Sequence, residues 1–128
     1  MSADEITDTV INNIKSKKYN IIIVNYANPD MVGHTGNFNA TVKSIEKIDS
    51  CIEKLIKYTQ EYNIITVITA DHGNAEEMIL PNGEPMTSHT CNPVPFAIHN
   101  YNQTIELPKN GKLKDISPII CKLLEINT

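Results

Sequence analysis

Two apolar, β-branched runs separated by a long amphipathic stretch are the strongest constraint on the fold of this chain. Residues 21–26 have the sequence IIIVNY, and residues 64–70 have the sequence IITVITA. Unbroken apolar runs of this length are typical of strands that are buried on both faces. Between them, apolar residues recur at steps of three and four, which predicts one long helix. Strand, helix and strand in this order form a βαβ unit, so we expect the two strands to be parallel.

Helices are predicted at both ends of the chain. Ser2 and Glu5 have the spacing of a capping box, and an apolar helical stripe follows them. Residues 113–126 predict a closing helix, with Pro118 tolerated in its first turn. The residues expected to face the core are Ile6, Val10, Ile11 and Ile14 in the first helix, Val42, Ile45, Ile48, Ile52, Leu55 and Ile56 in the long helix, and Ile116, Ile119, Ile120, Leu123 and Leu124 in the last.

The stretch between the second strand and the closing helix predicts a hairpin and a third strand. Asn82 and Gly83 form a strong turn signal. Residues 92–100 are apolar and begin with prolines, which favours a strand whose start is guarded from pairing. We therefore predict an α/β fold in which a mainly parallel sheet is flanked by helices, in one domain over residues 1–128.

Composition narrows the classes of partner. The net charge is −4, and all 11 basic residues are lysines, so a nucleic-acid partner is not expected. The absence of arginine also removes the usual bidentate clamp for phosphate and carboxylate groups. Three widely spaced cysteines favour reduced thiols in a cytoplasmic protein rather than a disulfide framework. No apolar run approaches the length of a membrane span.

Carboxylates and imidazoles follow the predicted strands. Asp30 and His34 come after the first strand, Asp71 and His72 follow the second directly, and His89 precedes the third. Because the carboxyl ends of parallel strands meet at one edge of a sheet, these five side chains are expected to lie close together. Carboxylate with imidazole is a ligand mix for Mn, Fe or Zn. Five ligands exceed the needs of one ion with an open position, but they suit two neighbouring ions.

Each of the five residues also has an ordinary structural explanation. Asp30 alone is a good turn residue after a proline, and His34 alone a loop histidine bonded to backbone. Asp71 has the right chemistry to cap a helix that begins near residues 73–74. His89, between hydroxyl residues and close to Pro93, also fits an ordinary loop residue. Chance placement of all five at one predicted edge is improbable, and this coincidence favours the metal interpretation.

Other polar residues near this edge are expected to have supporting roles. Glu76 and Glu77 are interpreted as helix-start or solvent acids, and His99 as a surface residue. Cys91 is expected to be buried as a small apolar residue, with a soft metal ligand or an oxidation target as alternatives. Four hydroxyl residues without the context of a nucleophile are expected to hydrogen-bond to the ligands: Thr35, Thr87, Ser88 and Thr90.

Three long motifs carry a resemblance to a known family. They are NYANPDMVGHTGNFNATVKSIEKID, ITADHGNAEEM and SHTCNPVPF. Together they closely resemble the C-terminal part of the cofactor-independent (2,3-bisphosphoglycerate-independent) phosphoglycerate mutases, in the alkaline phosphatase superfamily. The likeness runs nearly from end to end, and one departure is Cys91, where the family usually has a residue such as threonine.

The resemblance implies a fold and a chemistry. It implies an alkaline phosphatase-like α/β fold and the glycolytic interconversion of 3-phosphoglycerate and 2-phosphoglycerate through a phosphoserine, without 2,3-bisphosphoglycerate. Two divalent ions, usually Mn²⁺, would assist the transfer. Matched onto this chain, Asp30, His34 and His89 would hold one ion, and Asp71 and His72 would contribute to the other.

The resemblance also implies what these residues lack. The family's serine nucleophile, a further aspartate ligand and its substrate-binding arginines lie upstream of the matched part. The chain is therefore expected to be an incomplete, C-terminal segment that is inactive alone and prone to self-association. Two alternatives remain open: another two-metal member of the superfamily, such as a phosphopentomutase or a phosphodiesterase, and a metal-binding module without catalysis.

Overall fold

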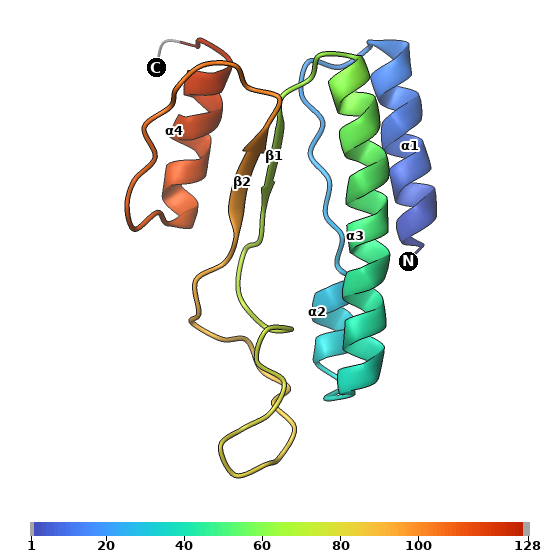
Figure 1. Ribbon diagram of the computed structural model, residues 1–128, viewed down its shortest axis with the longest axis vertical. Helices are drawn as coiled ribbons and strands as arrows, with labels where there is room; N and C mark the ends of the chain where they lie inside the picture. The colour runs from blue at the N-terminus through green and yellow to red at the C-terminus, as the bar shows by residue number, and fades with distance from the viewer. Residues whose placement is uncertain (1, 127–128) are drawn as a thin grey trace.

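The computed structural model describes residues 2–126 and is a mixed α/β structure (Figure 1). Helices α1 and α3 stand side by side at one side of the molecule, α4 stands at the other, and two strands lie between them in this view. The elements in chain order are α1 (Ala3–Ser16), α2 (Asn28–Gly33), α3 (Phe38–Glu61), β1 (Thr66–Thr69), β2 (Phe96–His99) and α4 (Leu113–Leu123).

Helix α1 begins where the sequence predicts. The Ser2 hydroxyl oxygen accepts a hydrogen bond from the Glu5 backbone N–H at 3.4 Å, and Lys17 ends the helix in the left-handed conformation. Ile11 and Ile14 are buried as predicted. The predicted stripe is displaced by part of a turn, however, because Ala3 and Thr7 share the buried face while Ile6 and Val10 line an open groove.

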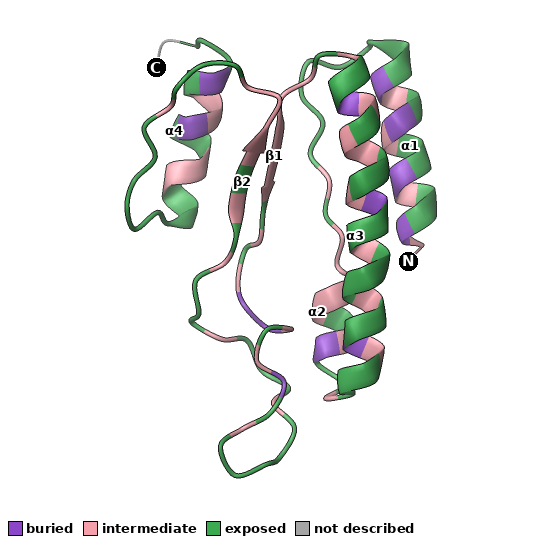
Figure 2. Ribbon diagram, viewed as in Figure 1, coloured by how far each residue is buried: buried purple, intermediate pink, exposed green. Residues whose placement is uncertain are grey.

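Helix α3 packs along α1 and α2 and is the longest element of the structure. Asn37 caps it, since its side-chain oxygen accepts from the Ala40 N–H at 3.0 Å. Only a narrow side of the helix is buried, as Figure 2 shows by its few purple turns. Val42 and Ile45, which were expected to face the core, are 40% and 44% exposed.

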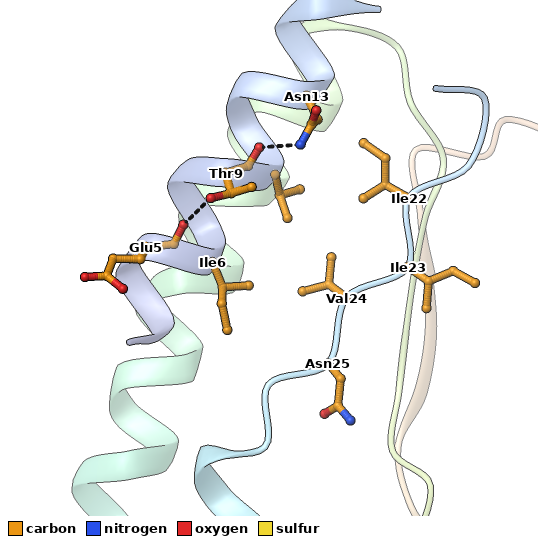
Figure 3. A pocket seen from close by; sticks show the side chains of 9 residues that line it. Glu5, Ile6, Thr9, Asn13, Ile22, Ile23, Val24 and Asn25 are labelled. Atoms are coloured by element: carbon orange, nitrogen blue, oxygen red, sulfur yellow. Dashed lines mark hydrogen bonds between the residues drawn. The ribbon is translucent and has the colours of Figure 1, made fainter. Parts of the chain in front are cut away.

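The predicted strand over residues 21–26 is wrong for this chain. The segment is extended, but within the described residues it joins no sheet. Ile23 is 89% exposed. Ile22 and Val24 point toward α1 across a groove of about 450 Å³, whereas Ile23 points away (Figure 3). The side chains alternate as in a strand, but neither β1 nor β2 pairs with this segment.

The prediction of a parallel sheet is also wrong. Strands β1 and β2 form an antiparallel pair in which Thr66 lies opposite His99 and Thr69 opposite Phe96. The direction reverses because the connection folds back on itself as a long hairpin. The predicted turn at its tip is confirmed: Gly83 has a φ of 85°, and the Leu80 N–H donates to the Glu84 carbonyl at 2.8 Å.

The closing helix is confirmed, but its buried residues and the position of Pro118 differ from the prediction. Helix α4 buries Ile119 and Leu123, but Leu124 is 39% exposed. Pro118 stands in the second turn rather than the first, so it removes an internal backbone hydrogen bond. Among the helices that the structure describes, none is both long enough and apolar enough to cross a membrane.

Candidate metal centre

Three of the five predicted ligands converge on one point. The Asp30 Oδ1 atom lies 3.2 Å from His34 Nε2 and 3.1 Å from His89 Nε2, and the two Nε2 atoms are 3.1 Å apart. The three side chains are each partly exposed, from 37% to 47%. Asp30, His34 and His89 are called the triad below.

A short helix, rather than the loop expected from the sequence, positions two members of the triad. Helix α2 starts with Pro29, which favours the first turn of a helix, and His34 is its C-cap. Residues four apart in a helix lie on the same face. The helix thereby places the Asp30 carboxylate and the His34 ring side by side.

The return half of the hairpin supplies the third member. The Thr90 N–H donates to the Gly73 carbonyl at 2.9 Å, which holds His89 next to the loop that follows β1. His34 Nδ1 lies 2.6 Å from the Thr87 carbonyl oxygen. Because a carbonyl oxygen only accepts, Nδ1 carries a proton, so Nε2 is the ring nitrogen that is available to bind a ligand.

The spacing of the triad fits a divalent cation. Donor atoms that share a first-row ion at bonds of about 2.1 Å lie about 3.0 to 3.4 Å from one another. The three measured separations of 3.1, 3.1 and 3.2 Å fall within that range. Two imidazoles and one carboxylate leave coordination positions open, as a catalytic ion requires.

The other two predicted ligands lie beside the triad rather than in it. The His72 ring stacks on the His89 ring with centroids 3.6 Å apart and planes inclined by 19°. Asp71 is 75% exposed in its side chain and lies 3.7 Å from His72 Nε2. His72 Nδ1 is buried without a hydrogen-bond partner among the described residues. Asp71 and His72 thus lie next to the triad, but their ligand atoms are not part of the cluster that Asp30, His34 and His89 form.

Two residues that organise the site were missed by the sequence analysis. Asn74 is buried, and its Nδ2 donates to Asp30 Oδ1 at 3.0 Å. Glu76 joins both halves of the hairpin: its carboxylate accepts from the Asn74 N–H at 2.6 Å and from the Thr90 hydroxyl. No helix begins near residues 73–74, so the helix-start interpretation of Glu76 and Glu77 and the interpretation of Asp71 as a cap are wrong. Glu76 is exposed, which agrees with the alternative interpretation of it as a solvent acid.

The supporting roles expected of other polar residues are partly corrected. Cys91 is exposed rather than buried, whereas Cys51 is buried, and all three cysteines are free. His99 is half-buried in β2, with Nε2 buried, so it is not a surface residue. Thr87 contacts a ligand through its backbone carbonyl, and the Thr90 hydroxyl contacts Glu76 rather than a ligand.

Hydrogen bonding lowers the pKa of Glu76. Partial burial would raise the pKa of Glu76, but hydrogen bonds from Thr90, from backbone N–H groups and from Asn92 outweigh it, so the pKa lies below its usual value of 4.5. A carboxylate with a lowered folded-state pKa stabilises the fold above its unfolded pKa, and this contribution is lost as the pH falls through the folded value.

We therefore expect Glu76→Gln to lower the free energy of unfolding near neutral pH, by an amount that shrinks below about pH 4.5. Urea unfolding of both proteins between about pH 7 and about pH 3 measures this difference. Parallel stability profiles for the variant and the wild type would contradict the role given to Glu76.

Comparison with known proteins shows which family this chain belongs to. A family model described as the metalloenzyme superfamily matches residues 1–128. The 2,3-bisphosphoglycerate-independent phosphoglycerate mutase of Ehrlichia canis is 55% identical over 127 residues, which are 98% of this chain and 25% of that protein. The corresponding mutase 2 of Methanosarcina barkeri is 54% identical over 127 residues, 98% of this chain and 24% of that protein.

A solved structure agrees with these relatives. A phosphoglycerate mutase from Leishmania mexicana, determined at low cobalt concentration, superposes with a TM-score of 0.88 and 31% identity, over 98% of this chain and 26% of the other. The chain spans about a quarter of the length of the relatives it matches. Over nearly its whole length it resembles 2,3-bisphosphoglycerate-independent phosphoglycerate mutases, and it belongs to the metalloenzyme superfamily.

Proposed function

We propose that this chain supplies the metal-binding part of a phosphoglycerate mutase that interconverts 3-phosphoglycerate and 2-phosphoglycerate through a phosphoserine. The observation that carries the proposal is the triad, three ligand atoms within 4.8 Å of one another in a chain 55% identical to such a mutase. An alkaline phosphatase-like fold, of which this chain forms one part, belongs to the same proposal.

Two divalent ions, with Mn²⁺ as the usual choice, fit the donors present. Asp30, His34 and His89 would hold one ion, and Asp71 and His72 would contribute to the other. Bound there, the ions supply Lewis acidity and positive charge for the transfer of a phosphoryl group. The chain's own part is to fix the ligand atoms: α2 orients two of them, and the hairpin delivers the rest.

The chain alone is proposed to be inactive. It contains no arginine to clamp a phosphorylated acid, and its net charge of −4 does not favour an anionic substrate. The relatives' names favour a phosphoglycerate mutase over the other two-metal phosphate enzymes considered above. A metal-binding module without catalysis is the alternative that the next experiment separates.

A chimera tests the proposal. The quarter of the Ehrlichia canis mutase that matches this chain is replaced by residues 1–128, and conversion of 3-phosphoglycerate is measured with Mn²⁺. We expect the chimera to convert the substrate and the same chimera with His89→Ala to lose at least about 100-fold in rate, because an ion ligand is removed. The isolated chain is expected to show no conversion.

Each outcome has a clear meaning. A folded chimera that binds Mn²⁺ but does not turn over would contradict the mutase assignment and favour the non-catalytic module. Steady conversion by the isolated chain would contradict the claim that it is inactive alone.

A further inference from the structure

Asn74 lies at the junction between the two groups of candidate ligands. It follows Asp71 and His72 by a few residues in the chain, yet its side chain reaches Asp30 on α2. It is only 5% exposed, although it stands in an irregular loop. A buried amide in a loop needs a reason, because burying a polar group is unfavourable unless it makes hydrogen bonds.

The amide donates to the ligand oxygen itself. Asn74 Nδ2 lies 3.0 Å from Asp30 Oδ1, the same oxygen that faces the Nε2 atoms of His34 and His89. A carboxylate oxygen has more than one lone-pair direction, so it can accept from an amide and still face a cation. The hydrogen bond restricts the rotation of the Asp30 carboxylate and fixes which oxygen is presented to the ion.

The surroundings hold the amide in a single orientation. Its amide nitrogen must face the carboxylate, because an amide oxygen there would be repelled. Asn74 Oδ1 then lies over Gly33, where an added Cβ would be 2.0 Å from that oxygen. The Asn74 backbone N–H is tied to Glu76 at 2.6 Å. Gly33 on α2 therefore leaves the space that Asn74 fills.

We propose that Asn74 is a positioning residue for the Asp30 ligand and that Gly33 lacks a side chain in order to admit it. The inference rests on the proposed metal function and deepens it, since it assigns a role outside the five candidate ligands. Loss of a hydrogen bond to a metal ligand typically lowers metal affinity 10- to 100-fold, and a change of about this size is expected here.

The test measures Mn²⁺ binding to the full chain by isothermal titration calorimetry for the wild type and Asn74→Leu. Leucine has the same number and branching of side-chain heavy atoms but no donor, so we expect affinity to fall by about 10- to 100-fold. Ile11→Val is the matched control, because it trims a buried residue of α1, a helix that carries none of the five candidate ligands. Its Mn²⁺ affinity should equal that of the wild type.

A second variant and a spectroscopic measurement guard against simple misfolding. Gly33→Ala pushes the amide away from Asp30 while leaving Asn74 in the sequence, and the same loss of affinity is expected. The visible absorption of bound Co²⁺ reports the geometry of the ligands. It should change in Asn74→Leu and Gly33→Ala but not in Ile11→Val.

Failure of this inference is distinct from failure of the proposed metal site. If His34→Ala weakens Mn²⁺ binding while Asn74→Leu and Gly33→Ala bind as the wild type does, the metal site stands and the role of Asn74 is rejected. If the wild type binds no Mn²⁺, or binds it equally well without His34, both are rejected.

Discussion

Replacing His34 or His89 by alanine is expected to weaken Mn²⁺ binding by more than about 100-fold, which exceeds the usual effect of losing an outer hydrogen bond. Each substitution removes one of three donor atoms that lie 3.1 to 3.2 Å from one another. The remaining two donors are a common arrangement on protein surfaces and hold an ion weakly. Titration of the purified chain with Mn²⁺ measures the change.

His99→Ala is the matched control for this prediction. It also removes an imidazole, but His99 lies on β2 opposite Thr66 rather than in the triad. Its Mn²⁺ affinity should match that of the wild type. Equal weakening in all three variants would indicate a general loss of structure, and unchanged binding in His34→Ala and His89→Ala would contradict the metal centre.

The second large effect concerns stability rather than binding. Ile11 is 4% exposed on the face of α1 that packs along α3. Ile11→Ala is expected to lower the free energy of unfolding by about 2 to 4 kcal/mol, because it removes buried methyl groups and leaves a cavity. Few apolar residues are buried in the part of the chain that the structure describes, so a loss of this size is a large share of the stability. Urea unfolding followed by circular dichroism measures it.

Ile23→Ala makes the same chemical change at an exposed position. Ile23 is 89% exposed in the extended segment, so its truncation should change the free energy of unfolding by less than about 0.5 kcal/mol. A large loss of unfolding free energy in Ile23→Ala would contradict the exposure of this segment. It would instead favour the strand buried on both faces that the sequence predicts.

The sequence was sufficient where local chemistry decides the outcome. The capping serine of α1 and the Asn82-Gly83 turn each act over a few residues, and both appear as predicted. The convergence of Asp30, His34 and His89 was also predicted, but from parallel strands that the structure does not have. Helix α2 and the long hairpin bring the three side chains together instead. Their role as metal ligands stays a prediction for the measurements above.

The sequence was insufficient where distant contacts decide. An apolar β-branched run has the same sequence whether or not a neighbouring strand covers it, so the sequence does not show that Ile21, Ile22 and Ile23 are exposed. Helix α2 is only six residues long and shows no period. The direction of β2 depends on how a long hairpin folds back, and hydrophobic pattern alone does not encode it.

The role of Asn74 was hidden for the same reason. An asparagine after a glycine is an ordinary loop signal. Its function depends on Asp30, 44 positions earlier in the chain, and on the space above Gly33. Neither contact can be predicted from the residues next to Asn74 in the sequence.

The most direct test of the central claim is X-ray diffraction from crystals grown with Mn²⁺, with data collected at the manganese absorption edge. The account predicts an anomalous peak bonded to Asp30 Oδ1, His34 Nε2 and His89 Nε2. A peak bonded to other residues, or no peak at this position with the ion in excess, would contradict it.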